Sequence, residues 1–208
     1  MLTFIYENEH GILVRMKSYI VGIGNKGKEY DGTRHNIGRT IVDAYAQSLS
    51  SEFSYNKTVD ALVAKDADVT FVLPETFVNK SGYSVGKIVK NKKAAETLLV
   101  VRDDLDMPLG TMKMTFGRGS GGHKGVESIA RALKTKDFAQ LKIGISPSTP
   151  KGKLKKVSGE EKVAKFVLAR FSPNDQTALK KMSKKAQAVI EMFISDGVEK
   201  AQMFANTQ

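Results

Sequence analysis

Cysteine and tryptophan are absent from this 208-residue chain, and histidine occurs only three times, as His10, His35 and His123. Without cysteine the chain can form neither disulfides nor thiolate metal sites, and a reducing compartment is consistent with that composition. So few histidines also argue against a histidine-rich metal centre. We therefore expect no metal in this protein, and a cytoplasmic location.

Long hydrophobic runs are also missing. No apolar stretch approaches the ~20 residues that a membrane-spanning helix needs, and the N-terminal segment MLTFIYENEHGILVRMK lacks the basic region and cleavage site of a signal peptide. We expect no membrane partner. Met16 stands just before a strong strand pattern, so residues 1–15 are expected to be an N-terminal extension outside the fold, non-native or disordered. Residues 16–208 then form one domain.

Positive charge is what the chain has in excess. It carries 33 lysines and arginines against 22 acidic residues, a net charge of +11, with an isoelectric point near 9.7. Such a surface attracts polyanions, of which nucleic acid is the commonest inside cells. The lysines cluster within 151–156 and 180–185 rather than scatter, which favours a polyanionic partner over a role in solubility alone.

Hydrophobic periodicity predicts strands that alternate with helices. Strands are expected at 19–23, 60–65, 69–73, 97–101, 111–116 and 141–145, and helices at 37–49, 76–91, 126–134 and beyond Pro173. The second and third strands flank the turn 66–68 and suggest a hairpin, and 111–116 alternates as an edge strand does. This order predicts the α/β class: a single three-layer α/β/α domain with a mixed, largely parallel twisted sheet.

The glycines of GIGNKGKEYDGTRHNIG (22–38) satisfy the G-x-G-x-x-G pattern of a dinucleotide-binding loop. In that fold the third glycine opens a helix, and an acidic residue ends the next strand. Here Gly27 precedes a polar run, the helical period begins only at Ile37, and the acidic residue at the right distance, Asp43, falls within the expected helix. We therefore expect no dinucleotide and no other cofactor.

The same loop can instead present Asn25, His35 and Asn36 at the edge of the sheet where α/β proteins bind ligands. A single histidine at a helix start is more often a cap or a surface residue than a catalyst. Asp103, however, follows the strand 97–101 and is expected at the same edge, where an Asp–His pair makes a general base. For Asp104 and Asp106, helix capping or charge balance is the favoured interpretation. With no cysteine and no G-x-S-x-G, activated water is favoured over a covalent nucleophile.

Several motifs in register resemble those of the bacterial peptidyl-tRNA hydrolase family. They are YIVGIGNKGKEYDGTRHNIG (19–38), LPETFVNKSG (73–82), VVRDDLDMPLG (100–110), GSGGHKG (119–125), LKIGI (141–145) and KFVLARFSP (165–173). The resemblance covers roughly residues 17–205. It implies a monomeric, cofactor-free esterase whose substrate is peptidyl-tRNA, cleaved at the ester between the peptide and the terminal ribose.

The resemblance also implies roles for individual residues. His35 is the base that activates water and Asp103 orients it, while Asn25 and Asn79 hold the peptide main chain or the ester carbonyl. The remaining implied residues are Tyr30 and Phe77, which shape the groove, and Lys113 and Lys142, which clamp the tRNA 5′-phosphate. On residue type alone, Asn79 reads as a capping residue and each lysine as a solvated surface charge.

Three positions depart from the family pattern. Lys124 stands where the family has an asparagine that positions substrate or water, Lys26 replaces a proline, and Val78 replaces a methionine. A lysine donates hydrogen bonds but accepts none, and its charge lowers the basicity of a nearby imidazole. Lys124 is expected at the substrate site. It also keeps an alternative open: a non-catalytic RNA-binding relative on the same fold.

Overall fold

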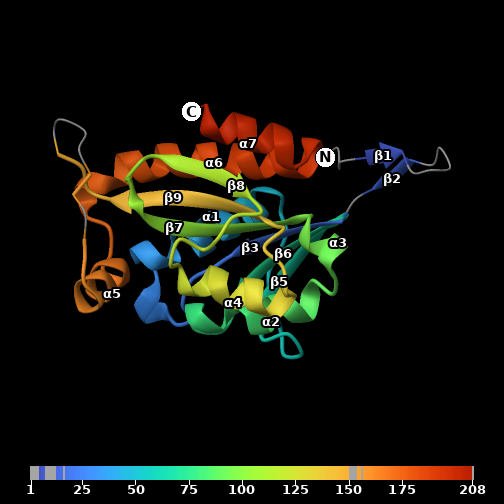
Figure 1. The fold of residues 1–208 in the computed structure, drawn as a ribbon, viewed down its shortest axis with the longest axis horizontal. Coiled ribbons are helices and arrows are strands. Elements are labelled where there is room, and N and C mark those ends of the chain that lie inside the picture. Colours follow the sequence, from blue (N-terminus) through green and yellow to red (C-terminus); the bar gives the residue numbers. More distant parts are fainter. Residues whose placement is uncertain (1–4, 8–12, 16, 150–153, 156, 208) are drawn as a thin grey trace.

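The computed structural model describes residues 5–7, 13–15, 17–149, 154–155 and 157–207. Its centre is a seven-stranded sheet with strand order β4-β5-β6-β3-β7-β9-β8 (Figure 1). The strands are β3 (Ser18–Gly22), β4 (Ser54–Asn56), β5 (Ala61–Asp66), β6 (Val69–Pro74), β7 (Leu98–Pro108), β8 (Met112–Phe116) and β9 (Ala139–Ser146). The four strands β6, β3, β7 and β9 run parallel. At one edge β5 pairs antiparallel with β6 and β4 pairs antiparallel with β5, and at the other edge β8 pairs antiparallel with β9.

Helices cover both faces of the sheet. They are α1 (Ile37–Ser48), α2 (Ser81–Ile88), α3 (Lys92–Ala95), α4 (Lys124–Leu133), α5 (Glu160–Leu168), α6 (Gln176–Asp196) and α7 (Val198–Asn206). In Figure 1, α6 and α7 lie on one side of the sheet and α2 and α4 on the other, while α5 stands apart at one end. The expected three-layer α/β/α domain with a mixed sheet is therefore confirmed.

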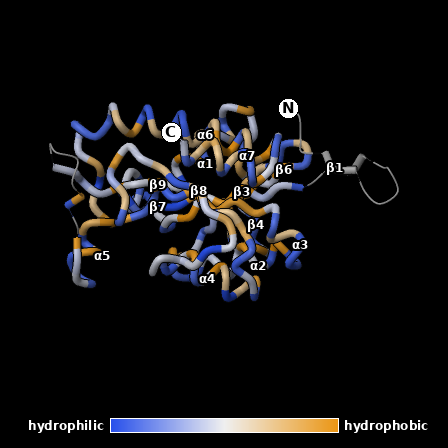
Figure 2. Tube along the Cα trace, turned by 45° about the horizontal axis from the view of Figure 1, so that its top comes forward, coloured by the Kyte–Doolittle hydropathy of each residue, from blue (hydrophilic) through white to orange (hydrophobic). Residues whose placement is uncertain are grey.

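The core is divided by the sheet, because side chains alternate along each strand. In β7, Leu99 and Val101 pack in the cluster with α1 and α6, whereas Leu98 and Val100 pack in the cluster with α2 and α4. Figure 2 shows the hydrophobic segments gathered where the helices meet the sheet. Burial of apolar surface at ~25 cal/mol per Å² supplies most of the driving force for this arrangement.

Most predicted elements are confirmed, with shifted ends. The hairpin is β5–β6, the edge strand is β8, and the amphipathic helix after Pro173 is α6. The helix expected at 76–91 is shorter: a 3₁₀ turn, η3 (Val78–Lys80), leads into α2. Glycine is required at position 82, because a Cβ there would lie 2.1 Å from the Ser128 carbonyl oxygen, too close for any other residue. The glycine thus lets α2 approach α4 closely.

Six of the described helices and strands were not predicted from the sequence: α3, α5, α7 and the short strands β1 (Ile5–Glu7), β2 (Leu13–Arg15) and β4. Residues 1–15 were expected to be an extension outside the fold. In the described part of that segment, β1 and β2 pair with each other, in a sheet separate from the main one. His10, Met16, Lys151, Lys153 and Lys156 lie outside the described residues. Within the described part, no helix combines the length and the apolar character needed to cross a membrane.

Candidate active site

A hollow of about 890 Å³ opens where β3 and β6 end and α4 and α5 begin. Three groups of residues share its wall: polar residues of the loops after β3 and β6, the His35–Asp103–His123 cluster, and one apolar face of α5. The lining includes Asn25, His35, Phe77, Val78, Asn79, Asp103, His123, Lys124, Glu160, Val163 and Val167. Six of the nine site residues expected from the sequence therefore meet in one cavity: Asn25, His35, Phe77, Asn79, Asp103 and Lys124.

His35 is brought to Asp103 by the close packing of α1 on the sheet. The 3₁₀ turn η2 (Arg34–Asn36) leads directly into α1. Gly38 makes this approach possible, since a Cβ there would lie 2.1 Å from the Val101 carbonyl oxygen. Strand β7 does not end before Asp103, as the sequence suggested, but runs on because β9 pairs with it beyond the end of β3. Asp103 therefore lies within β7, at a position where β9 still pairs with β7 but β3 has already ended.

The His35 Nδ1 atom lies 2.9 Å from Oδ1 of Asp103. The Asp103 side chain is 3% exposed and that of His35 is 18% exposed. Burial by itself lowers the pKa of His35, but the charge and hydrogen bond of Asp103 outweigh burial and raise it above the usual value. Because Nδ1–H donates to the carboxylate, Nε2 is left as the basic nitrogen, the arrangement that a general base requires.

His123 is a site residue that was not predicted from the sequence. Its Nε2 lies 3.0 Å from the same Oδ1 of Asp103, while its Nδ1 accepts from the backbone N–H groups of Gly125 and Val126 and so caps α4. Since Nδ1 must be unprotonated to act as this cap, the proton lies on Nε2. Burial lowers the pKa of His123, consistent with a neutral imidazole.

Asp103 is stabilised as an anion although it is buried. Burial by itself raises its pKa, but the two imidazoles lower it well below the usual range. Arg102 adds a cation next to it: Nη1 donates to the Asp103 carbonyl and lies 3.1 Å from Oδ2 of Asp104, and Nη2 donates to the Ser120 carbonyl. Of the two expected roles of Asp104, the structure shows charge balance, because Asp104 lies within β7 and pairs with Arg102.

Asn25 and Asn36 lock the loop after β3 onto η2. The Asn25 backbone N–H donates to Oδ1 of Asn36, and Nδ2 of Asn36 donates back to the Asn25 carbonyl. Asn36 is only 2% exposed, so the expectation that it faces a ligand is wrong. Its side-chain amide instead forms these two hydrogen bonds with the backbone of Asn25, a pair that we call the Asn25–Asn36 bracket. The Asn25 side chain accepts from the Val78 N–H at 2.9 Å. Its oxygen thus has a partner in the protein, whereas its Nδ2 donates to none of the described residues and Asn25 lines the hollow.

Asn79 and Phe77 line the hollow from the segment after β6. The caps of η3 and α2 are Phe77 and Lys80, neither with a side-chain capping bond, so Asn79 does not act as the capping residue that its type suggested. Its exposed side chain hydrogen-bonds to none of the described residues. Phe77 is 47% exposed, and the Tyr30 ring packs edge-on against it at 6.4 Å. Tyr30 therefore supports the wall through Phe77.

The opposite wall is α5, which Arg34 fastens to η2. The Arg34 Nη1 donates to the carbonyls of Ala169 and Arg170, at 3.2 and 2.9 Å. Its guanidinium also lies 4.5 Å from the ring centre of Phe166 and 5.2 Å from that of Phe171. These contacts hold the C-terminal end of α5 against η2, the turn that carries His35.

Lys124 begins α4 at the mouth of the hollow, and Glu160 begins α5 across from it. Their side chains form an ion pair at 3.3 Å, with exposures of 69% and 91%. An ion pair this exposed contributes about 0–1 kcal/mol, so either partner is free to bind a ligand instead.

Lys113 and Lys142 lie outside the hollow, in one row with Arg102 across β8, β9 and β7. Paired residues of neighbouring strands point to the same face, so the three cations share one side of the sheet. Burial, Arg102 and Lys113 together lower the pKa of Lys142, despite the opposing charge of Asp104. An anion placed here would relieve that repulsion.

His35, Asp103 and His123 also have the donor set that could hold a metal ion, with atoms within 4.8 Å of one another. Two imidazoles and a carboxylate suit zinc. In the described geometry the three are joined by hydrogen bonds, in which each imidazole donates a proton to Asp103. Metal binding would have to displace both protons, so the hydrogen-bonded base is the function that this arrangement favours.

The sequence and the fold are those of a known group of enzymes. Residues 19–208 match the family model described as Peptidyl-tRNA hydrolase. The peptidyl-tRNA hydrolase of Hydrogenobaculum sp. is 36% identical over 191 residues, covering 91% of this chain and 97% of that protein. The Aquifex aeolicus protein of the same name is 35% identical, covering 91% and 96%. The crystal structure of peptidyl-tRNA hydrolase from Acinetobacter baumannii superposes with a TM-score of 0.81 at 28% identity, over 93% and 97% of the two chains.

This chain belongs to the peptidyl-tRNA hydrolase family. The resemblance noted from the sequence motifs is thereby confirmed, and the match extends through α7 to the end of the chain.

Proposed function

We propose that this protein hydrolyses the ester that joins a peptide, or an N-blocked aminoacyl group, to the 3′ end of tRNA, and so recycles tRNA from stalled or aborted translation. The observation that carries the proposal is the His35–Asp103 pair at 2.9 Å, which faces a hollow edged by amide side chains. Membership of the family supports the same substrate. The excess positive charge suits a nucleic-acid substrate.

The reaction uses water as the nucleophile. Nε2 of His35 takes a proton from the water as it attacks the ester carbonyl, and Asp103 stabilises the imidazolium that results. The imidazolium then returns the proton to the departing ribose oxygen. The Nδ2 groups of Asn25 and Asn79 donate to the carbonyl oxygen or the peptide backbone. Recognition through backbone groups lets one site accept peptides of any sequence.

An ester-release assay on N-acetyl-aminoacyl-tRNA tests this function. Wild type should release the N-acetyl amino acid, and His35→Ala should lose roughly 100-fold or more in kcat while still binding tRNA. The same tRNA with a free α-amino group should resist cleavage, which separates this activity from a general esterase. Absence of turnover by wild type, or full turnover by His35→Ala, would contradict the proposal.

A second candidate function, RNA binding without catalysis, rests on Lys124. Its ammonium stands at the mouth of the hollow, held by Glu160, where the family pattern has an asparagine. We favour catalysis, with Lys124 as a substrate contact, because the His35–Asp103 pair and the Asn25 bracket are complete. Lys124→Asn discriminates: a modest change in KM fits a substrate contact, whereas a large gain from near-zero activity would favour the binding module.

The tRNA itself would be held by basic residues outside the hollow. Lys113 and Lys142 form the proposed clamp for the 5′-phosphate, a role supported by their pairing in one row with Arg102 on the same face of the sheet. The exposed lysines of α6, Lys180, Lys181 and Lys184 among them, would add attraction to the RNA backbone. We further propose that the enzyme works in the cytoplasm as a monomer without metal or cofactor. Size-exclusion chromatography with light scattering tests its oligomeric state.

A further inference from the structure

A second hollow, of about 690 Å³, lies between the glycine-rich loop 117–122 and α4, and we name it the loop–α4 hollow. Four basic residues and one acidic residue line it: Arg118, Arg131, Lys134, Lys136 and Glu127. In the active-site hollow, by contrast, Lys80 and Lys124 are balanced by Asp103 and Glu160. The loop–α4 hollow therefore has a net positive lining, which predicts an anionic ligand.

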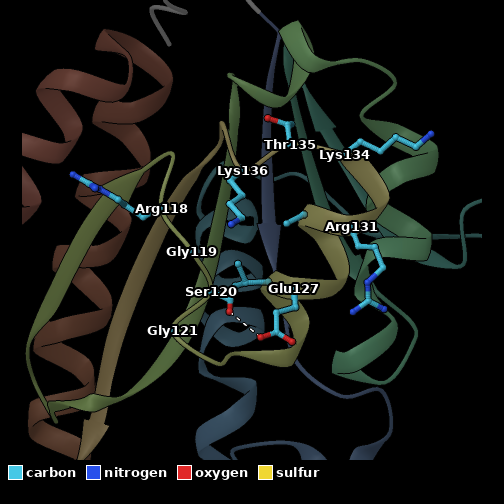
Figure 3. Close-up of a pocket in the computed structure, with 11 residues that line it drawn as sticks. Arg118, Gly119, Ser120, Gly121, Glu127, Arg131, Lys134, Thr135 and Lys136 are labelled. Atoms are coloured by element: carbon cyan, nitrogen blue, oxygen red, sulfur yellow. Dashed lines mark hydrogen bonds between the residues drawn. The ribbon is translucent and has the colours of Figure 1, made fainter.

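The basic side chains of this hollow are available to such a ligand. All four residues are exposed, and none forms a side-chain hydrogen bond or ion pair with the described residues. Figure 3 shows Lys136 extending into the space between the loop and α4, whereas Arg118, Arg131 and Lys134 point away from it. The single acid, Glu127, accepts from the Ser120 hydroxyl at 3.0 Å. The Glu127 carboxylate is therefore turned toward Ser120 of the loop.

The loop itself offers further donors. Among the described residues, the backbone N–H groups of 118–121 have no acceptor, although the neighbouring amides of Gly117, Gly122 and His123 are all bonded. Gly121 has a φ of 60°, in the left-handed region where glycine is favoured. Runs of free backbone N–H groups in such turns bind anions, phosphate in particular. This feature is independent of the basic side chains and points to the same kind of ligand.

The loop also ties this hollow to the active site. Arg102, next to the catalytic Asp103, donates to the Ser120 carbonyl at 3.3 Å, and Gln140 donates to the Arg118 carbonyl at 2.9 Å. The same loop then leads into His123, whose backbone N–H returns to Ser120. One wall of the loop–α4 hollow is therefore held at a fixed position relative to the catalytic cluster. A ligand that enters both sites must reach from one hollow to the other and carry negative charge at the loop–α4 end.

We infer that the loop–α4 hollow binds a backbone phosphate of the tRNA, at a point beyond the 3′ end that enters the active site. This inference rests on the proposed function and names a further contact with the same substrate. Lys136 neutralises the phosphate inside the hollow, and the loop amides donate to the phosphate oxygens. Arg131, exposed at the rim, adds positive charge. Because a contact with phosphate positions the RNA but reads no base, it adds affinity without sequence preference.

The test compares two double variants that remove equal charge. Arg131→Gln/Lys136→Gln alters the hollow, and Lys57→Gln/Lys65→Gln alters exposed lysines near the β4–β5 edge, at the opposite end of the sheet. Binding of uncharged tRNA is measured against salt, and hydrolysis is measured on N-acetyl-aminoacyl-tRNA and on the same ester of the trinucleotide CCA. The hollow variant loses the contact with one phosphate, so it should reduce the salt slope of log K by about 1 relative to wild type. Its KM for full-length tRNA should rise on the order of tenfold at about 0.15 M salt, with kcat unchanged.

Each further outcome has a defined meaning. Hydrolysis of the CCA ester should be unaffected, and Glu127→Gln should tighten tRNA binding, since it removes the one acid. Equal slopes and KM values for the two double variants would overturn the inference, as would an equal loss on the CCA ester, which would indicate damage to the loop. Competition by millimolar inorganic phosphate that equals competition by RNA would also overturn it, in favour of a small-anion site. If wild type cleaves neither ester, the proposed function fails. The measurement of tRNA binding against salt would still show whether the loop–α4 hollow contacts the RNA.

Discussion

His35 and His123 are joined through a single atom: Nδ1 of the first and Nε2 of the second lie 2.9 and 3.0 Å from the same oxygen of Asp103. The two rings are 5.3 Å apart between centres. They differ in what binds their other nitrogen. In His123 it accepts the first amides of α4, whereas in His35 it accepts from none of the described residues. The cluster thus holds one fixed neutral imidazole and one that can accept a proton.

Replacement of Asp103 by asparagine should lower both kcat and the pH at which activity appears. The base works only when neutral, so kcat/KM rises with pH through the pKa of His35, which Asp103 raises above 6.5. Without the carboxylate charge that pKa falls, and the acidic limb of the profile moves to lower pH. We expect kcat to drop roughly 100-fold or more, because the imidazolium loses its counter-ion. Profiles of kcat/KM between about pH 5 and 9 measure both effects. A limb that stays in place would show that His35 is not the titrating base.

Replacement of His123 should move the same limb in the opposite direction. His35 would then be the only imidazole bonded to Asp103, so the carboxylate would raise the pKa of His35 further. His123→Asn can still cap α4, since asparagine is a favourable N-cap, whereas His123→Ala loses the cap and about 1 kcal/mol of stability. Both variants should shift the limb to higher pH, and only the alanine variant should unfold at a clearly lower temperature. A shift confined to the alanine variant would assign the effect to α4 and not to the bond with Asp103.

The pairing of His35 with Asp103 could be predicted from the order of strands and loops along the chain. The loop after the first strand and the acidic run after TLLVV both precede the same sheet edge, so the chain order alone was enough to pair His35 with Asp103. His123 could not be placed in this way, because the helix was expected to start at 126, which left the histidine in a loop. The helix begins at Lys124. That start makes His123 the N-cap, and histidine is not among the residues that usually signal one.

The rest of the wall depends on contacts that no local pattern encodes. Arg34 meets carbonyls of Ala169 and Arg170 far along the chain, and the helix that contains Val163 and Val167 is too short for a strong period. Asn36 shows the reverse case. Its position beside His35 predicted an exposed polar group, but the bracket with Asn25 buries it.

Variants of Asn25 should separate its structural role from its catalytic role. Asn25→Asp keeps an oxygen for the Val78 N–H but loses the Nδ2 donor, while Asn25→Ala loses both. The aspartate should therefore reduce kcat/KM roughly 10- to 100-fold, with the unfolding free energy little changed. The alanine should lose activity and about 1 kcal/mol of stability. Asn91→Asp is the matched control, because Asn91 also accepts a backbone N–H, at the start of α3. Equal activity of Asn25→Asp and wild type would remove Asn25 Nδ2 from the mechanism.

Arg34 should act on substrate binding through α5 without touching the base. Arg34→Met keeps the aliphatic stem but loses two hydrogen bonds to carbonyls and the contact with Phe166. The wall that carries Val163 should loosen, so we expect KM to rise severalfold and the unfolding free energy to fall by about 1–2 kcal/mol. Because His35 keeps its bond to Asp103, the pH at which kcat/KM rises should not move. Arg170→Met is the control: its exposed side chain forms no hydrogen bond or ion pair among the described residues, although its carbonyl serves Arg34. A shifted pH profile in Arg34→Met would show that this arginine instead acts on His35, its neighbour in sequence.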